Sequence, residues 1–303
     1  MKRFLLKIWN AAFDIKTKAV DMAYALWDAV YKRVKKPPCV MSVSGTIDFI
    51  VENRCSVSRF GDGEIKLVKG RDISFQNALP FVKKKLREVL SSDLPGHIVC
   101  LADIFGDRSR YNEKANAYWK KHLAQYRHTW YKYLINEKVY YNASVTRQYI
   151  SIKNRSESRD IFISLKRIWE DRDIVFIEGE KSRLGAGNDL FQNARSVRRI
   201  LGPSENAFSQ YEKLMREACK IEKTALFLLA LGPCATALAY DLHRAGYQAV
   251  DIGHVDVEYE WYLMRADKKI PLENKYVHEA GANAELGPYR NETYENQIIA
   301  KYL

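Results

Sequence analysis

The 303-residue sequence contains no apolar run long enough to cross a bilayer, which argues against a membrane-spanning helix. Residues 1–6 (MKRFLL) resemble the start of a signal peptide, but Lys7 interrupts the apolar stretch and no small-residue cleavage site follows. The five cysteines are odd in number, widely spaced and without a C-x-x-C motif, so a disulfide framework or zinc site is not expected. We therefore expect a cytoplasmic protein with reduced, mostly buried thiols.

Two common phosphate-binding fingerprints are also missing. The G-x-G formed by Gly185 and Gly187 has Leu190 where the dinucleotide fingerprint needs a third Gly or Ala. The Walker pattern does not occur anywhere in the chain. These absences exclude a typical NAD or FAD site and a P-loop.

The charge of the chain is strongly uneven. Hydrophobic residues make up 47% of the sequence, enough for a sizeable core, and the formal net charge is +12. Residues 1–36 carry nine Lys or Arg against three Asp, so about an eighth of the chain holds half of the excess. Because the basicity is concentrated there, nucleic-acid binding by the whole surface is not the first inference.

The basic N-terminal segment has the periodicity of an amphipathic helix over residues 4–34. Its apolar residues recur at three- and four-residue steps, at positions 4, 8, 12, 15, 19, 22, 26, 30 and 34. Pro37 and Pro38 end the pattern. The helix either packs on its own domain or a second subunit, or lies on a membrane surface with its lysines on anionic lipid. We predict residues 1–37 as a docking helix and 38–303 as the catalytic domain.

After Pro38, short apolar runs alternate with segments of helical periodicity. Candidate strands cover residues 56–60, 97–102, 174–178, 199–201, 225–231 and 249–252. Candidate helices cover residues 46–52, 81–90, 113–134, 157–169, 206–221, 235–245 and a last segment near 292–302. Strands that are apolar throughout are typical of a sheet covered by helices on both faces. The sequence predicts an α/β, Rossmann-like fold with a mostly parallel, doubly wound sheet.

An acidic pair follows the last candidate strand. Asp256 and Glu258 stand two residues apart, shortly after Gly253 and His254. If the chain stays extended, both side chains project from one face, and their oxygens could hold Mg²⁺ or Mn²⁺ beside a diphosphate. His254 could ligate the metal, contact the diphosphate or orient Asp256. The pair is the predicted metal site.

Polar and glycine-bearing segments follow other candidate strands, where ligands of open α/β sheets bind. After the first strand, Arg59 could bind a phosphate, and Asp62 and Glu64 could bind sugar hydroxyls or a metal-bound water. Composition alone favours a plain turn with its corner at Asp62-Gly63. Beyond Glu180, a loop is expected to lead into a helix near residue 189 or 190, whose N-terminus favours anions. Residues predicted to contact substrate are Arg59, Gly61, Gly63, Arg183, Gly185, Gly187, Asn188, Asn206, Gly232, Pro233 and His254.

Two of these assignments have a structural alternative. Gly232 and Pro233 lie between a strand and a helix, so they form either a phosphate or sugar cradle or an ordinary connection. Asn206 either reads a uracil edge or caps the following helix, and its sequence position favours the cap.

Four blocks, at residues 58–64, 178–191, 231–239 and 251–261, together resemble the GT-D-fold glycosyltransferases in order and spacing. The resemblance runs from about Ser44 to the C-terminus. It implies a Rossmann-like fold, a UDP-sugar donor and a D-x-E motif that supports Mn²⁺ or Mg²⁺ binding, here at Asp256 and Glu258. Candidates for the catalytic base are Asp62, Glu64 and Glu180.

The sequence therefore predicts a metal-dependent hexosyltransferase that uses a UDP-sugar, such as UDP-glucose, in bacterial surface glycan synthesis. Its expected acceptor is a saccharide or glycoprotein, and residues 1–36 are expected to contact a membrane or form a homo-oligomer, which would place the protein at the inner face of the membrane. No nucleic-acid partner is expected. The alternatives are a non-catalytic basic α/β protein that binds nucleic acid or an anionic surface, and a metal-dependent phosphohydrolase.

Overall fold

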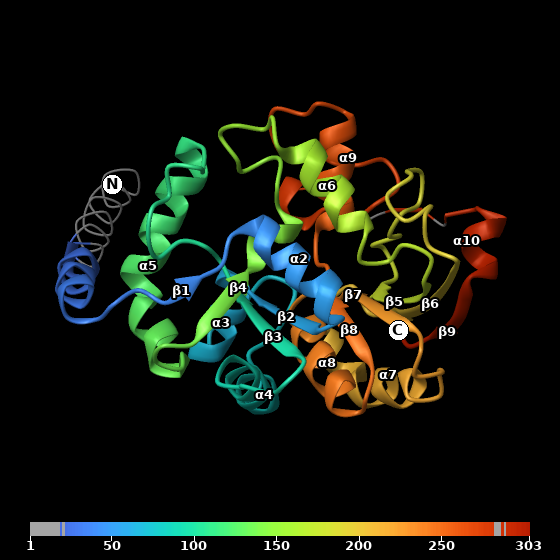
Figure 1. The fold of residues 1–303 in the computed structure, drawn as a ribbon, viewed down its shortest axis with the longest axis horizontal. Helices are drawn as coiled ribbons and strands as arrows, with labels where there is room; N and C mark the ends of the chain where they lie inside the picture. Colours follow the sequence, from blue (N-terminus) through green and yellow to red (C-terminus); the bar gives the residue numbers. More distant parts are fainter. Residues whose placement is uncertain (1–18, 20–21, 282–285, 288) are drawn as a thin grey trace, which may run out of the picture.

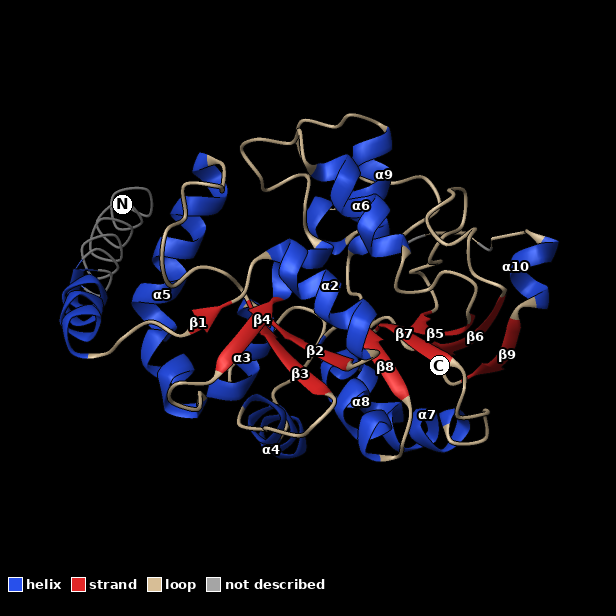
Figure 2. Cartoon of the chain, viewed as in Figure 1, coloured by secondary structure: helices blue, strands red, loops and turns tan. Residues whose placement is uncertain are grey.

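A computed structural model describes residues 19, 22–281, 286–287 and 289–303 of the chain. Nine strands form one sheet in the order β1-β4-β3-β2-β8-β7-β5-β6-β9, and every pairing is parallel (Figures 1 and 2). The strands are β1 (Cys39–Val40), β2 (Ser56–Phe60), β3 (His97–Leu101), β4 (Val139–Asn142), β5 (Asp173–Gly179), β6 (Ser196–Gly202), β7 (Leu226–Ala230), β8 (Gln248–Asp251) and β9 (Ile298–Lys301).

Helices cover both faces of the sheet. The α-helices are α2 (Val43–Asn53), α3 (Asp62–Lys69), α4 (Pro80–Leu90), α5 (Glu113–Tyr133), α6 (Ser158–Lys166), α7 (Tyr211–Ala218), α8 (Pro233–Arg244), α9 (Val255–Leu263) and α10 (Glu292–Asn296). In the described part of the chain, three short 3₁₀ helices are η1 (Ala143–Thr146), η2 (Ala207–Gln210) and η3 (His278–Ala280). Figure 1 shows α2, α6 and α9 on one side of the sheet and α3, α4, α7 and α8 on the other.

The central strand β7 shows why its sequence is apolar throughout. Phe227 and Leu229 point into a core shared with α3, α4, α5, α7 and α8, whereas Leu226 and Leu228 point into a second core shared with α2 and α6. Because side chains alternate across a strand, a strand covered on both faces favours apolar residues on both faces and reads as a nearly continuous apolar run. The predicted α/β, doubly wound, Rossmann-like fold is confirmed, and the sheet is entirely parallel.

Several predicted elements differ from the structure. Strands β1, β4 and β9 were not expected, and the predicted last helix ends at Asn296 before β9 begins. The predicted turn at Asp62-Gly63 is the first turn of α3. No helix begins near residue 189 or 190, because residues 180–195 form successive turns. The expected anion site at a helix N-terminus is therefore wrong at that position.

The strand order creates two points where the chain changes direction across the sheet. From β2 the chain proceeds to β3 on one side, and β8 pairs with the other side of β2. Likewise, β6 and β7 pair with opposite sides of β5. In open α/β sheets, the crevice at the carboxyl ends of such strands is where ligands bind.

The predicted N-terminal helix falls partly outside the described residues. Its described part is helical over residues 22–34 and ends at Lys35, before Pro37. Within the part of the chain that the structure describes, no helix is both long and apolar enough to cross a membrane.

Candidate functional site

Arg59, near the carboxyl end of β2, joins three segments of the fold. Its Nε donates to the Asp251 carbonyl at 2.8 Å and its Nη2 to Asp251 Oδ1 at 2.9 Å. Its Nη1 donates to Thr146 Oγ1 at 2.7 Å. The guanidinium therefore holds β2, β8 and η1 together, and the predicted phosphate contact of Arg59 stays a prediction.

Gly253 makes this arrangement of Arg59 feasible. Its φ is 44°, in the left-handed region that favours glycine. A Cβ at this position would lie 1.8 Å from Arg59 Nη2. Any larger residue would therefore force the guanidinium to move away from the end of β8.

The first turn of α3 places two of the candidate carboxylates at the same edge. Glu64 Oε2 accepts a hydrogen bond from Gly61 N at 2.8 Å, and Gly63 lies inside the turn. Burial, together with the nearby carboxylates of Asp251 and Asp62, raises the pKa of Glu64 to about 7. Glu64 can therefore exchange a proton near neutral pH.

Asp62 has a different environment. Lys66 Nζ donates to its Oδ2 at 2.6 Å, and the Tyr118 hydroxyl donates to the same oxygen. Burial acts to raise the pKa of Asp62, but these two donors outweigh it and the pKa is lowered. Asp62 is therefore an ionised hydrogen-bond acceptor, whereas Glu64 is the better proton acceptor at neutral pH.

His254, the residue before α9, belongs to a partly buried chain of polar contacts. Arg147 Nη2 donates to His254 Nδ1 at 2.9 Å, and the same guanidinium binds Glu279 Oε1 at 2.6 Å. Burial and Arg147 lower the pKa of His254 to about 3. Because Nδ1 accepts a hydrogen bond in this neutral ring, the proton is on Nε2, which is left as a donor.

The backbone at the D-x-E motif is helical, so the expectation of an extended segment is wrong. Asp256 and Glu258 belong to the first turn of α9, where residues two apart point in widely different directions. Asp256 Oδ1 accepts from Asn188 Nδ2 at 2.8 Å and from Gly185 N at 3.1 Å. Glu258 Oε2 accepts from the backbone of a different segment, at Tyr149 N (2.9 Å) and Ile150 N (3.0 Å).

These two carboxylates do not fit a shared divalent cation in this arrangement. Lys275 Nζ lies 2.7 Å from Asp256 Oδ2 and 2.8 Å from Glu260 Oε1, so a buried ammonium already provides the positive charge beside Asp256. Glu258 Oε1 is buried without a hydrogen-bond partner, and Glu258 Oε2 is bonded to the backbone at Tyr149 and Ile150. Within the described residues, no group of three or more His, Cys, Asp or Glu side chains is placed to hold a metal ion.

The glycine-bearing loop after β5 packs against other parts of the chain. Arg183 donates from Nη1 to the Asn274 carbonyl at 3.0 Å and from Nη2 to the Gly287 carbonyl at 2.7 Å. Gly185 and Gly187 have positive φ values of 68° and 86°. Through Asp256 and Lys275, this loop is joined to α9 and to the segment near residue 275.

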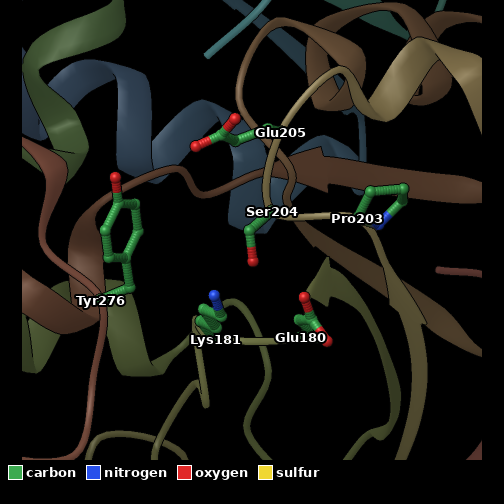
Figure 3. Close-up of a pocket in the computed structure, with 6 residues that line it drawn as sticks. All are labelled: Glu180, Lys181, Pro203, Ser204, Glu205 and Tyr276. Atoms are coloured by element: carbon green, nitrogen blue, oxygen red, sulfur yellow. The ribbon is translucent and has the colours of Figure 1, made fainter. Parts of the chain in front are cut away.

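A pocket of about 270 Å³ lies at the carboxyl ends of β5 and β6 (Figure 3). Its lining residues are Glu180, Lys181, Pro203, Ser204, Glu205 and Tyr276. Ser204 Oγ is buried and has no hydrogen-bond partner within the protein. Strands β8 and β7 separate β5 from β2, so Glu180 and Glu64 lie about three strand spacings, roughly 14 Å, apart along the sheet edge. The structure thus separates Glu180 from the other two candidate bases.

The connection between β7 and α8 lies between the β5–β6 pocket and the β2–β8 crevice. Gly232, at the end of β7, has a φ of 54°, and a Cβ there would lie 2.9 Å from the Phe75 ring. Pro233 begins α8, as the sequence suggests. The favoured capping role of the Asn206 side chain is wrong: its Oδ1 accepts instead from Asn77 N at 2.9 Å. This bond fixes the segment that carries Phe75.

Five residues of this edge were missed by the sequence reasoning: Tyr118, Arg147, Lys275, Tyr276 and Glu279. Arg147 follows η1 after a strand that was not predicted, so a recognised β4 would have drawn attention to it. Lys275, Tyr276 and Glu279 lie in a segment that is mostly irregular, where the sequence has no periodic pattern.

Comparison with known proteins gives consistent matches. The family described as "Glycosyltransferase GT-D fold" matches residues 57–280. A "Probable glycosyl transferase Gly" of Streptococcus gordonii is 38% identical over 262 residues, and "Glycosyltransferase GlyD" of Streptococcus pneumoniae is 38% identical over 274 residues. These matches cover 86% and 89% of this chain but only 38% and 34% of the two relatives, so the chain spans little more than a third of their length.

Solved structures match over nearly their whole length. A structure described as a new glycosyltransferase from Streptococcus sanguinis has 36% identity and a TM-score of 0.85, with 88% of this chain and 100% of that chain covered. A second, described as a domain with a distinct glycosyltransferase fold, has 35% identity, a TM-score of 0.85, and coverage of 93% and 99%. The overall fold described above therefore recurs in these proteins.

Proposed function

Because the chain belongs to the glycosyltransferase GT-D fold family, we propose that it transfers a hexose from a UDP-sugar to a saccharide or glycoprotein acceptor in bacterial surface glycan synthesis. The observation that carries this proposal is the pair of carboxylates at the start of α3, beside the β2–β8 crevice. One of them, Glu64, has a pKa of about 7, and the other, Asp62, is held ionised by Lys66 and Tyr118.

Glu64 is the proposed base for the acceptor hydroxyl. A general base works best when its pKa is close to the working pH, because it is then both available and strong enough to take a proton. Its Oε2 is anchored by Gly61 N, which orients the carboxyl group. In the proposed step the acceptor oxygen bonds to the sugar carbon, the bond from that carbon to the diphosphate breaks, and the hydroxyl proton passes to Glu64.

The acceptor is proposed to lie beside Asp62 and Tyr118. The Tyr118 side chain is half exposed, and its hydroxyl is bonded to Asp62, which fixes the position of its ring. An aromatic ring with a solvent-exposed, polar edge can pack against the C–H groups of a sugar and form hydrogen bonds with its hydroxyl groups. Lys66 supplies a further donor at this position.

The leaving diphosphate is proposed to lie near His254 and the N-terminus of α9. The Nε2–H of His254 and the backbone N–H groups of a helix start are donors that favour an anion. Preorganised donors stabilise charge that develops on a leaving group. Arg147 holds His254 in the tautomer that makes this donor available.

The nucleoside part of the donor is proposed to occupy the pocket at β5 and β6. Tyr276 offers an aromatic surface, and the buried Ser204 hydroxyl needs a hydrogen-bond partner. This pocket and the β2–β8 crevice lie along the same sheet edge, so one elongated nucleotide sugar can reach both.

Dependence on Mn²⁺ or Mg²⁺ stays a prediction. A divalent ion beside the diphosphate would neutralise part of its charge. Since Asp256 and Glu258 do not converge in this structure, no step above is assigned to a metal held by that pair. Location in the cytoplasm, at the inner face of the membrane, is likewise proposed.

The proposal is tested by measuring UDP release from a panel of UDP-sugars and UDP binding by calorimetry. Ser204→Val should weaken UDP binding, whereas Glu64→Gln should leave binding intact and stop UDP release. UDP binding that Ser204→Val does not change would place the nucleoside elsewhere.

A further inference from the structure

The described part of the N-terminal helix, residues 22–34, packs on the domain through its polar side. Asp28 is buried and forms an ion pair with Arg127 of α5, which is also buried. Tyr31 stacks on Tyr131 of α5, with ring centroids 6.0 Å apart. Figure 1 shows this helix lying beside α5, at the edge of the molecule beyond β1. The contacts with α5 therefore use an acidic residue and a tyrosine rather than the apolar stripe.

The apolar stripe of this helix faces solvent. Met22, Leu26, Trp27, Val30 and Val34 have 64%, 66%, 58%, 54% and 72% of their surface exposed. Their spacing of mainly four residues places them along one side of the helix. Within the described residues, five of the fourteen exposed large hydrophobic side chains lie in these thirteen positions, so they form a patch rather than scattered exposure.

The charges beside this patch have one sign. Lys32, Arg33, Lys35 and Lys36 are all exposed, and Lys32 also forms an ion pair with Asp28 at 3.0 Å. The single acidic residue between positions 22 and 36, Asp28, is turned inward against Arg127. An exposed apolar stripe bordered only by basic residues matches the boundary of an anionic bilayer, where apolar side chains enter the interface and cations meet headgroups. Trp27 is of the residue type enriched at that boundary.

From this geometry, we propose that the outward face of residues 22–36 docks on an anionic lipid surface. A second copy of the chain is the less suitable occupant, because a symmetric contact would bring the basic residues of both copies together. The exposed apolar residues contribute through the area that they bury in the interface, and Arg33, Lys35 and Lys36 add electrostatic attraction to negative headgroups, since Lys32 is paired with Asp28. No step of the proposed sugar transfer is needed for this inference.

Co-sedimentation of the full chain with vesicles tests the proposal. Phosphatidylcholine vesicles are compared with vesicles that also contain phosphatidylglycerol, each at low and high salt. The wild-type chain should bind the anionic vesicles and be released by salt, because charge attraction is screened beyond about 10 Å at 0.1 M. Lys35→Gln with Lys36→Gln should weaken binding about 25-fold, from roughly five-fold for each basic residue.

Two further variants separate the contribution of the apolar patch from nonspecific adsorption through any exposed apolar residue. Leu26→Ser with Trp27→Ser should abolish vesicle binding, and far-UV circular dichroism should show that the fold is retained. The control is Ile163→Ser on α6, a similarly exposed residue (53%) on another surface, which should bind vesicles as the wild type does. If the wild-type protein does not co-sediment with anionic vesicles, the proposal is overturned. A dimer that Leu26→Ser with Trp27→Ser dissociates, without any vesicle binding, would assign the face to a second copy.

Discussion

Replacing Lys275 with methionine should destabilise the protein strongly. Lys275 is almost fully buried (2% exposed) between Asp256 (1%) and Glu260 (14%), at 2.7 and 2.8 Å. Methionine keeps most of the side-chain volume but removes the charge, which leaves two carboxylates close together without their cation. Breaking a buried ion pair by removing one partner costs about 3–5 kcal/mol, because the remaining charge is uncompensated.

This loss is large against the total stability of a domain, which is typically about 5–15 kcal/mol. With a denaturant dependence of about 3 kcal/mol per molar urea, the unfolding midpoint should fall by roughly 1–2 M. Urea unfolding followed by tryptophan fluorescence measures the shift. The matched control is Lys220→Met, whose ammonium lies at the same 2.7 Å from Glu217 but is largely exposed (68%), and which should leave the midpoint nearly unchanged.

A triple variant distinguishes lost charge balance from lost packing. If Lys275→Met destabilises the protein because the carboxylates of Asp256 and Glu260 lose their cation, adding Asp256→Asn and Glu260→Gln should restore much of the lost stability. A midpoint for Lys275→Met that equals the wild type would refute the reasoning and reopen Asp256 as a metal ligand.

Three other predictions follow. Activity should rise with pH through about 7, because Glu64 must lose its proton to act as a base. The pKa of Glu64 is about 7 in the folded chain and about 4.5 in the unfolded chain, so its contribution to the free energy of unfolding should fall as the pH rises from about 4.5 to about 7. Urea unfolding of wild type and Glu64→Gln at several pH values measures this loss. Gly253→Ala should lower stability by about 1–3 kcal/mol, because its Cβ meets Arg59, and by more than Gly187→Ala, which has a positive φ but open space around it; equal losses would exclude the clash as the cause. If the enzyme is metal-dependent, chelator should stop UDP release and Mn²⁺ should restore it; unaffected release would contradict the metal prediction.

The sequence predicted the elements whose identity depends on burial. The segments that become β2, β5, β7 and β8 are predicted to within one or two residues, and the apolar runs of β5 and β7 mark strands that helices cover on both faces. It does not predict the edge strand β9, which is partly exposed and lies directly after α10; the sequence instead predicts one helix over the whole segment. Edge strands with little burial leave a weak pattern.

The site was predicted less completely, for reasons seen in particular residues. The acidic Asp256 and Glu258 were recognised, but i and i+2 positions share a face only in a strand, and the segment is helical. The partner of Asp256, Lys275, lies in a C-terminal segment that is mostly irregular and reaches the site only through tertiary folding. Asp62 and Glu64 look equivalent in sequence, but Lys66 and Tyr118 lower the pKa of Asp62, whereas burial and the nearby carboxylates of Asp251 and Asp62 raise that of Glu64.

The most direct test of the central claim is UDP release from UDP-sugars by wild type and Glu64→Gln, with water or a saccharide mixture as acceptor and UDP binding measured in parallel. Wild type should release UDP from at least one donor, and Glu64→Gln should release it about 10²–10⁴-fold more slowly while binding UDP equally well. Glu222→Gln, a surface carboxylate, should behave as wild type. Absence of UDP release from every donor, or a Glu64→Gln variant as fast as wild type, would contradict the account.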